Sequence, residues 1–168
     1  MGRGVEGLVR QVEQHVDGAL VAAGLFQPNV ARLPEFGVLG VVTMPLNWRR
    51  EQQAMDEGLG LAPSTLVVVT PETVYVFDAW LLGWGGVRLL LEHPRRSLLA
   101  RTVPLAEPRA PAEVRMSPPE LSALRLEDGE GRILAEPAPQ GWGDEVKRVF
   151  RVLTGHEGKT SKGTRGVM

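Results

Sequence analysis

The stretch that decides the fold is residues 66–78, which read Leu66-Val-Val-Val-Thr-Pro-Glu-Thr-Val-Tyr-Val-Phe-Asp78. Two runs rich in β-branched and aromatic residues flank the short turn at Pro71-Glu72, and this pattern predicts a β-hairpin. In the second run, apolar residues occupy both sets of alternating positions, so both faces of the strand are largely apolar. We therefore expect this strand to lie in the interior of a sheet.

Further strands are predicted on both sides of this hairpin. The predicted strands are residues 36–44 between two prolines, 87–92, 97–105 after a turn at 93–96, 113–116, and a second hairpin of 121–126 and 132–136. The tip of the second hairpin contains Asp128-Gly129, and Asp-Gly supplies the positive φ angles that such turns need. Because these strands follow one another without helices between them, they predict antiparallel pairing and exclude βαβ units.

Amphipathic helices are predicted at both ends of this run of strands. Residues 5–25 carry valines and leucines at three- and four-residue spacings, with Gly24 as the stop. The second helix begins near Asp144 and ends at Gly155. Residues 47–57 are polar and predict either helical turns or a loop, whereas 80–86 predict a flexible connection.

The fold class is therefore α+β, and the chain divides into three parts. An N-terminal amphipathic helix covers residues 1–27, an antiparallel β domain with its C-terminal helix covers 34–155, and a disordered tail covers 156–168. A Pro/Ala-rich linker at 107–112 interrupts the β domain. We expect the N-terminal helix to pack on its own domain rather than on a neighbour.

The composition excludes several classes of function. The formal net charge of −1 gives no overall attraction to nucleic acid or acidic lipid, so an electrostatic partner would need a local patch. The absence of cysteine excludes a disulfide framework, thiol catalysis and zinc–thiolate sites. No run of about 18 apolar residues occurs, and no apolar signal core is visible. We expect a cytoplasmic protein that binds no nucleic acid.

The succession of strands resembles the pleckstrin-homology-like superfold, a bent antiparallel barrel that a C-terminal helix plugs at one end. Val67-Val-Val-Thr-Pro-Glu-Thr-Val-Tyr-Val-Phe-Asp78 is similar to the hairpin of bacterial PH-like and GRAM-like domains. His93-Pro-Arg-Arg-Ser-Leu-Leu-Ala-Arg101 resembles their next strand, Leu124-Arg-Leu-Glu-Asp-Gly129 their later hairpin, and residues 142–153 their closing helix. The resemblance implies a PH-like barrel with an added N-terminal helix. It implies no single function, because the superfold includes lipid binders, peptide binders and scaffolds.

Residues typical of catalysis do not gather in the sequence. His15, His93 and His156 fall on a helix, in a turn and in the tail, and no Gly-x-Ser-x-Gly elbow, His-Glu-x-x-His pair or phosphate loop is present. The paired carboxylates at Asp56-Glu57 and in the later hairpin lack the ligand spacing of a calcium site. We expect no enzyme, no metal and no small-molecule cofactor. A small enzyme with an unrecognised site is the second alternative, and a pocket that joins His93 to a carboxylate such as Asp78 would support it.

Basic side chains and tryptophans lie in or beside the predicted loops. The tentative binding surface consists of Arg49, Arg50, Trp80, Trp84, Arg95 and Arg96. Arginine holds phosphate through charge-assisted hydrogen bonds, and tryptophan suits a membrane interface. Acidic residues interleave with these arginines, and an arginine-rich surface is also a compositional feature of this chain.

The leading hypothesis is a non-enzymatic binding or scaffolding module that contacts a protein partner or a second copy of itself. The alternative is peripheral binding of anionic lipid headgroups through the four arginines of the tentative surface. Scaffolding predicts exposed apolar side chains around the two tryptophans or along the first helix. Lipid binding predicts that Arg95→Glu together with Arg96→Glu abolishes association with vesicles.

Overall fold

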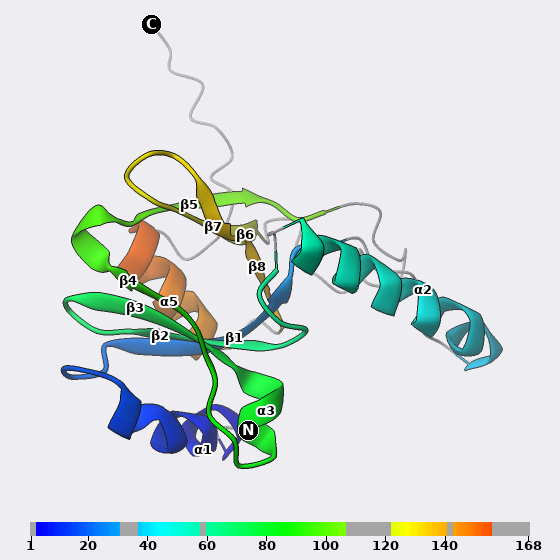
Figure 1. Ribbon diagram of the computed structural model, residues 1–168, viewed down its shortest axis with the longest axis horizontal. Coiled ribbons are helices and arrows are strands. Elements are labelled where there is room, and N and C mark those ends of the chain that lie inside the picture. The colour runs from blue at the N-terminus through cyan, green and yellow to red at the C-terminus, as the bar shows by residue number, and fades with distance from the viewer. Residues whose placement is uncertain (1–2, 31–36, 58–59, 107–121, 141–142, 156–168) are drawn as a thin grey trace, which may run out of the picture.

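The computed structural model of the chain describes residues 3–30, 37–57, 60–106, 122–140 and 143–155. Its strands form two antiparallel sheets, with helices on both sides of the larger one (Figure 1). The larger sheet has five strands in the order β4-β3-β2-β1-β8, and the smaller has three in the order β5-β6-β7. This α+β architecture, with a helix at each end, confirms the fold class predicted from the sequence.

Seven of the eight described strands follow α2 in the chain. In chain order the elements are α1 (Arg3–Val12), η1 (Glu13–His15), β1 (Ala22–Pro28), α2 (Gly37–Asp56), β2 (Thr65–Val69), β3 (Thr73–Asp78), α3 (Ala79–Gly83), β4 (Leu89–Pro94), η2 (Arg95–Ser97), β5 (Leu99–Pro104), β6 (Ser122–Glu127), β7 (Ile133–Ala135), β8 (Pro137–Pro139) and α5 (Asp144–Thr154). Strands β2, β3 and β4 are consecutive antiparallel neighbours, the arrangement that simple hairpin connections produce.

The hairpin of β2 and β3 forms the centre of the molecule, as predicted. Its register pairs Thr65 with Asp78 and Val69 with Val74. Both strands are interior to the five-stranded sheet, and all but one of their side chains are buried. Alternate residues of the hairpin enter two separate hydrophobic cores, so the doubly apolar pattern reflects a sheet covered on both faces.

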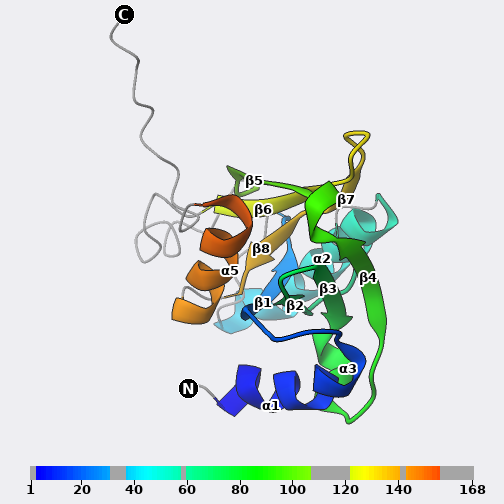
Figure 2. The same cartoon turned by 90° about the vertical axis from the view of Figure 1, so that its left-hand side faces the viewer.

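Different elements cover the two faces of the larger sheet. On one face, α1 and α3 pack side by side over Leu66, Val68 and Phe77 (Figure 2). On the other face, α5 and the three-stranded sheet close the main core, where the ring centroids of Phe26 and Phe150 lie 6.0 Å apart. The expectation that the N-terminal helix packs on its own domain is confirmed for α1.

The N-terminal helix is shorter than predicted. It ends at Val12, η1 ends at His15, and the chain then turns at Gly18, which has a φ of +93°. The prediction of a helix up to residue 27 is therefore wrong, because Ala22–Pro28 is strand β1. Pairing with β2 and β8 overrides the helical spacing here, since β1 occupies a central place in the sheet that a helix could not fill.

The predicted strand at 36–44 is also wrong. Residues Gly37–Asp56 form the 20-residue helix α2, which includes Pro45 and the polar residues from 47 onwards. Its valines recur at helical as well as strand spacing, and Pro45 was taken to end a strand although it lies within a helix. In Figure 1, α2 extends away from the two sheets, and its N-terminal, cyan end is farthest from them.

Residues 80–86, predicted to be a flexible connection, begin with the short helix α3. The Asp78 side chain caps it by accepting a hydrogen bond from the Leu81 N–H at 3.1 Å. A capped helical turn fixes the direction of the tryptophan side chains, which a flexible glycine-rich loop would not do.

The second predicted hairpin is confirmed as β6 and β7, but its turn works differently. The positive φ falls on Gly131, at +80°, and not on the Asp128-Gly129 pair. The Asp128 carboxylate accepts hydrogen bonds from the backbone N–H groups of Glu130 and Arg132, both at 2.9 Å. The bond from the Arg132 backbone is the main reason why the pKa of Asp128 is lowered from 3.8.

The C-terminal helix is confirmed as α5, which ends at Gly155 with a φ of +77°. The described strands form two separate antiparallel sheets and not a closed barrel, while the predicted C-terminal helix is present as α5. The predicted linker at 107–112, strand at 113–116 and tail at 156–168 lie outside the described residues, as does Trp142.

Candidate functional site

The arginines of the tentative surface lie in two separate places. Arg49 and Arg50 belong to α2, and Arg95 and Arg96 form η2 between β4 and β5. In Figure 1 the junction of β4 and β5 is at the left of the molecule and α2 extends to the right. Because both pairs cannot reach one headgroup, the four arginines do not form the single cluster that the sequence suggested.

Arg95 makes hydrogen bonds within the fold. Its guanidinium donates hydrogen bonds to the carbonyl oxygens of Thr70 at 3.3 Å and of Val152 at 3.0 Å. These bonds join the β2–β3 turn to the last turn of α5, where a cation is favoured by the helix dipole. Arg96, its neighbour, is exposed.

Trp80 and Trp84 are exposed on α3, as the scaffolding hypothesis predicts. Their exposed fractions are 64% and 77%, and their ring centroids lie 6.1 Å apart. Val87 and Leu89, which follow in the chain, are also exposed. The first helix offers no comparable surface, because the valines and leucine of α1 pack on the sheet.

Among the described residues, the largest group of exposed apolar side chains lies on α2, mostly before Arg49 and Arg50, and the sequence had not predicted these apolar side chains as part of a site. We call this group the α2 outer face, and it consists of Val38, Val41, Val42, Met44, Leu46 and Trp48. Their exposed fractions run from 41% for Leu46 to 88% for Val38. At 100° per residue, five of the six fall on one half of the helix, and Met44 lies at its border.

The opposite side of α2 is the buried one, and it carries polar groups. Asn47 is only 2% exposed and Ala54 only 3%, and both lie about 180° from the centre of the outer face. Thr43 and Arg50 on this side are partly buried. Over residues 38–48 the exposed side of the helix is therefore apolar, whereas the buried side of α2 includes both Asn47 and Ala54. In a surface helix the apolar side usually faces the protein.

Charge is also distributed unevenly along α2. The first charged residue after its start at Gly37 is Arg49, followed by Arg50, Glu51 and Asp56. The half of the helix that is farthest from the sheets is thus uncharged as well as apolar on its exposed side.

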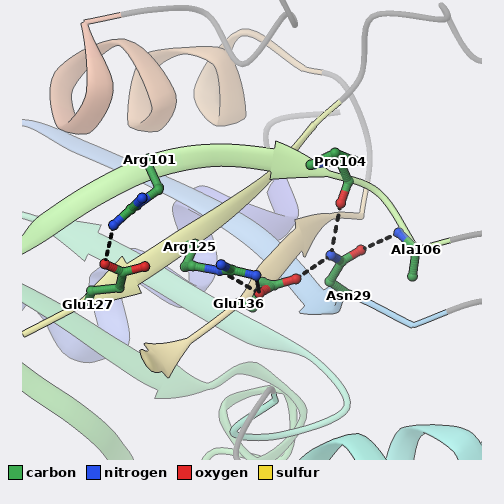
Figure 3. A network of polar contacts seen from close by, with 7 residues as sticks. All are labelled: Asn29, Arg101, Pro104, Ala106, Arg125, Glu127 and Glu136. Atoms are coloured by element: carbon green, nitrogen blue, oxygen red, sulfur yellow. Dashed lines mark hydrogen bonds and ion pairs between the residues drawn. The ribbon is translucent and has the colours of Figure 1, made fainter. Parts of the chain in front are cut away.

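A buried polar network connects the two sheets (Figure 3). Glu136 is only 7% exposed. Its carboxylate accepts hydrogen bonds from Asn29 Nδ2 at 2.7 Å and from Arg125 Nε at 2.8 Å. Asn29 also donates to the Pro104 carbonyl oxygen and accepts from the Ala106 N–H. The carboxylate is fully committed to these partners, which suits a structural clamp better than acid–base chemistry.

A second ion pair stands beside this network. Arg101 on β5 donates to the Glu127 carboxylate on β6 (Figure 3). Glu127 is 4% exposed, so this pair and the Glu136 network account for two of the buried acids. Neither adjoins a histidine, and within the described ranges no three His, Cys, Asp or Glu side chains are placed to hold a metal.

The residues proposed for a possible enzyme site are not brought together. His93 lies opposite Val74 at one end of β3, whereas Asp78 ends that strand and caps α3. His93 Nδ1 instead lies 3.0 Å from the Pro94 carbonyl oxygen. A shallow apolar depression near Gly60 and Pro137 offers about 10 Å³, roughly the space of one water.

No family model, curated protein or solved structure matches this chain. The fold and surface define an α+β protein of two antiparallel sheets in which, among the described residues, the largest group of exposed apolar side chains lies on one projecting helix. Among the residues that the structure describes, no helix has both the length and the apolar composition to cross a membrane.

Proposed function

We propose that this chain is a non-enzymatic binding or scaffolding module that acts through protein–protein contact at the α2 outer face. The observation that carries the proposal is the exposure of apolar side chains along the first half of α2, where Val38, Val41 and Val42 are 88%, 77% and 64% exposed. Exposed apolar patches of several hundred Å² are uncommon on monomers and mark interaction sites.

The energetics favour a partner for this face. In the single chain these side chains keep 41% to 88% of their surface exposed, and a partner that covers them gains roughly 25 cal/mol for each Å² of apolar surface removed from water. The absence of charge before Arg49 means that a partner can cover this part of the helix without stripping water from an ion. Trp48 adds the kind of large aromatic anchor that dominates many interfaces.

We further propose that the fold is PH-like. Two antiparallel sheets and the closing helix α5 support this assignment. Thr65 at the start of β2 pairs with Phe26 near the end of β1 and with Asp78 at the end of β3. The β1–β2 connection and the β3–β4 connection therefore lie at the same end of the larger sheet. Helices α2 and α3, with their exposed side chains, therefore both leave the sheet from this one end. The superfold serves many functions, so the surface and not the fold supports the function.

A photo-crosslinking experiment tests the proposed function. A benzophenone amino acid replaces Val42 in the full chain, expressed in the organism that carries the gene, and light is applied to living cells. The expected result is a protein adduct of higher mass. The matched control places the same group at Leu20, another exposed apolar position outside α2. Absence of adducts from position 42, or equal adducts from both positions, would overturn the proposal.

Anionic lipid is the second candidate, and one observation favours it. Exposed Trp48 adjoins Arg49 on α2, and a tryptophan beside basic residues suits the headgroup region. Co-flotation with neutral and anionic vesicles at two salt concentrations distinguishes the candidates. The lipid candidate predicts flotation with anionic vesicles alone, and predicts that higher salt abolishes it. It also predicts that Arg49→Glu abolishes flotation whereas Arg96→Glu does not. This combined result would favour lipid over protein contact.

A further inference from the structure

We infer that the occupant of the α2 outer face is the same face of a second copy of this chain, with the two helices antiparallel about a two-fold axis that crosses the outer face between Val42 and Met44. The inference rests on the proposed function, because it names the partner of that site. Three properties of the face support a second copy: its area, its charge pattern and its position in the molecule.

The area suits a weak symmetric dimer. At their exposed fractions the six side chains offer on the order of 600 Å² per copy, so a face-to-face pair buries roughly 1,200 Å². That is the lower limit for a specific interface, and we expect a dissociation constant on the order of micromolar. A two-fold pair uses one patch twice, so an uncharged apolar stripe is complementary to itself.

The charge pattern selects the antiparallel direction. With the axis crossing the outer face between Val42 and Met44, Val38 of one copy lies opposite Trp48 of the other, and Val42 lies opposite Met44. Arg49 then falls at the end of the contact, opposite the uncharged first residue of the partner helix. In a parallel pair, Arg49 would face its own symmetry mate across an apolar interface, which costs free energy.

The position of α2 makes this pairing sterically feasible. The uncharged half of the helix is the half that extends away from both sheets (Figure 1). Antiparallel overlap of two such halves places the two sets of sheets at opposite ends of the pair. A parallel overlap would bring both bodies to the same end, where they compete for space.

The test of self-association is analytical ultracentrifugation of the purified full chain over a range of concentrations. We expect a monomer–dimer equilibrium that weakens at least tenfold in the double variant Val41→Glu with Val42→Glu, which is about 1.4 kcal/mol. Leu20→Glu is the matched control and leaves the equilibrium unchanged. Circular dichroism establishes that each variant is folded. A chain that stays monomeric at every concentration would overturn the inference.

Cysteine crosslinking tests the direction of the helices, and the chain has no cysteine of its own to interfere. Under mild oxidation, Val42→Cys lies near the axis and is expected to form a disulfide-linked dimer. Val38→Cys alone is not expected to form a disulfide-linked dimer, because the two copies of position 38 lie ~15 Å apart in an antiparallel pair. A mixture of Val38→Cys and Trp48→Cys is expected to crosslink. Efficient crosslinking of Val38→Cys with itself would overturn the antiparallel arrangement.

The two proposals fail in distinguishable ways. If photo-crosslinking from position 42 yields adducts only with other proteins, and the purified chain is monomeric, the second copy is excluded while the proposed function stands. If neither crosslinking nor ultracentrifugation detects a protein on this face, both fail. Binding of vesicles through the same face, without dimer formation, would overturn the inference in favour of the lipid alternative.

Discussion

Glu136 is the residue through which the two sheets make their main polar contact. Its buried carboxylate accepts hydrogen bonds from Asn29, at the end of β1, and from Arg125 on β6. Removing one partner from a buried, charged network leaves the other groups without compensation, which costs more than the network contributes as a whole. The effect of a substitution here should therefore be large.

We predict that Glu136→Ala lowers the free energy of unfolding by about 3 kcal/mol, because Arg125 and Asn29 lose their acceptor in a buried site. Urea denaturation measures the change. Glu130→Ala is the control, since that carboxylate is largely exposed and its ion pair with Arg132 lies at the surface. A loss below about 1 kcal/mol for Glu136→Ala would show that water replaces the network.

Two adjacent arginines are predicted to behave differently. Arg95→Ala removes the hydrogen bonds to Thr70 and Val152 and should lower the free energy of unfolding by about 1–2 kcal/mol. Arg96→Ala, at an exposed neighbouring position, should change it by less than about 0.5 kcal/mol. Thermal and urea denaturation of the two variants provide the comparison. Equal effects would contradict the structural role assigned to Arg95.

At the scale of elements, two glycines of the β6–β7 hairpin provide a matched pair. Gly131 has a φ of +80°, whereas Gly129 does not have a positive φ. We predict that Gly131→Ala destabilises the chain by about 1 kcal/mol, because an L-residue is strained there, and that Gly129→Ala does not. Chemical denaturation measures both. The reverse order would place the left-handed residue where the sequence had predicted it, in the Asp-Gly pair.

Elements with strong local signals were predictable from the sequence, and those set by distant contacts were not. The β2–β3 hairpin and α5 carry their own turn and cap residues, so local reasoning located them. The valines of α2 suit a strand as well as a helix, and Pro45 favoured a strand end. β8 contains two prolines and forms only because β1 pairs with it at the edge of the sheet.

The candidate site was predictable only in part, for a related reason. Exposure of Trp80 and Trp84 follows from a chain segment rich in glycine, and the structure confirms it. The α2 outer face was missed because residues 36–44, which include four of its six side chains, were assigned to a strand. A helical projection of residues 37–56 would have shown the apolar stripe. Only the folded chain shows that the side with Asn47 and Ala54 is the buried one.

At the scale of the whole molecule, α2 is an insertion between neighbouring strands. Phe26 on β1 pairs directly with Thr65 on β2, and a Cβ added to Gly60 would lie 2.8 Å from the Pro28 ring. The chain thus leaves the sheet and returns close to where it left. This geometry indicates that the two sheets and their cores do not depend on α2.

We predict that replacing residues 31–59 with a short Gly-Ser linker leaves the protein folded and abolishes its self-association. The melting temperature should stay within about 5 °C of the full chain, because the two main cores contain no residue of α2. Calorimetry and ultracentrifugation measure the two properties. Loss of cooperative melting would show that α2 belongs to the core, and a persisting dimer would place the interface elsewhere.

Strand β1 has neighbours that are far apart in the chain. It pairs with β2 on one side and β8 on the other, while α5 packs across it. A growing chain leaves the ribosome N-terminus first, so β1 emerges long before β8 and α5 have been made. We expect the β1 edge that pairs with β8 to stay open in the nascent chain after β2 has paired with the other edge, and the main core to close in a late step after α5 emerges.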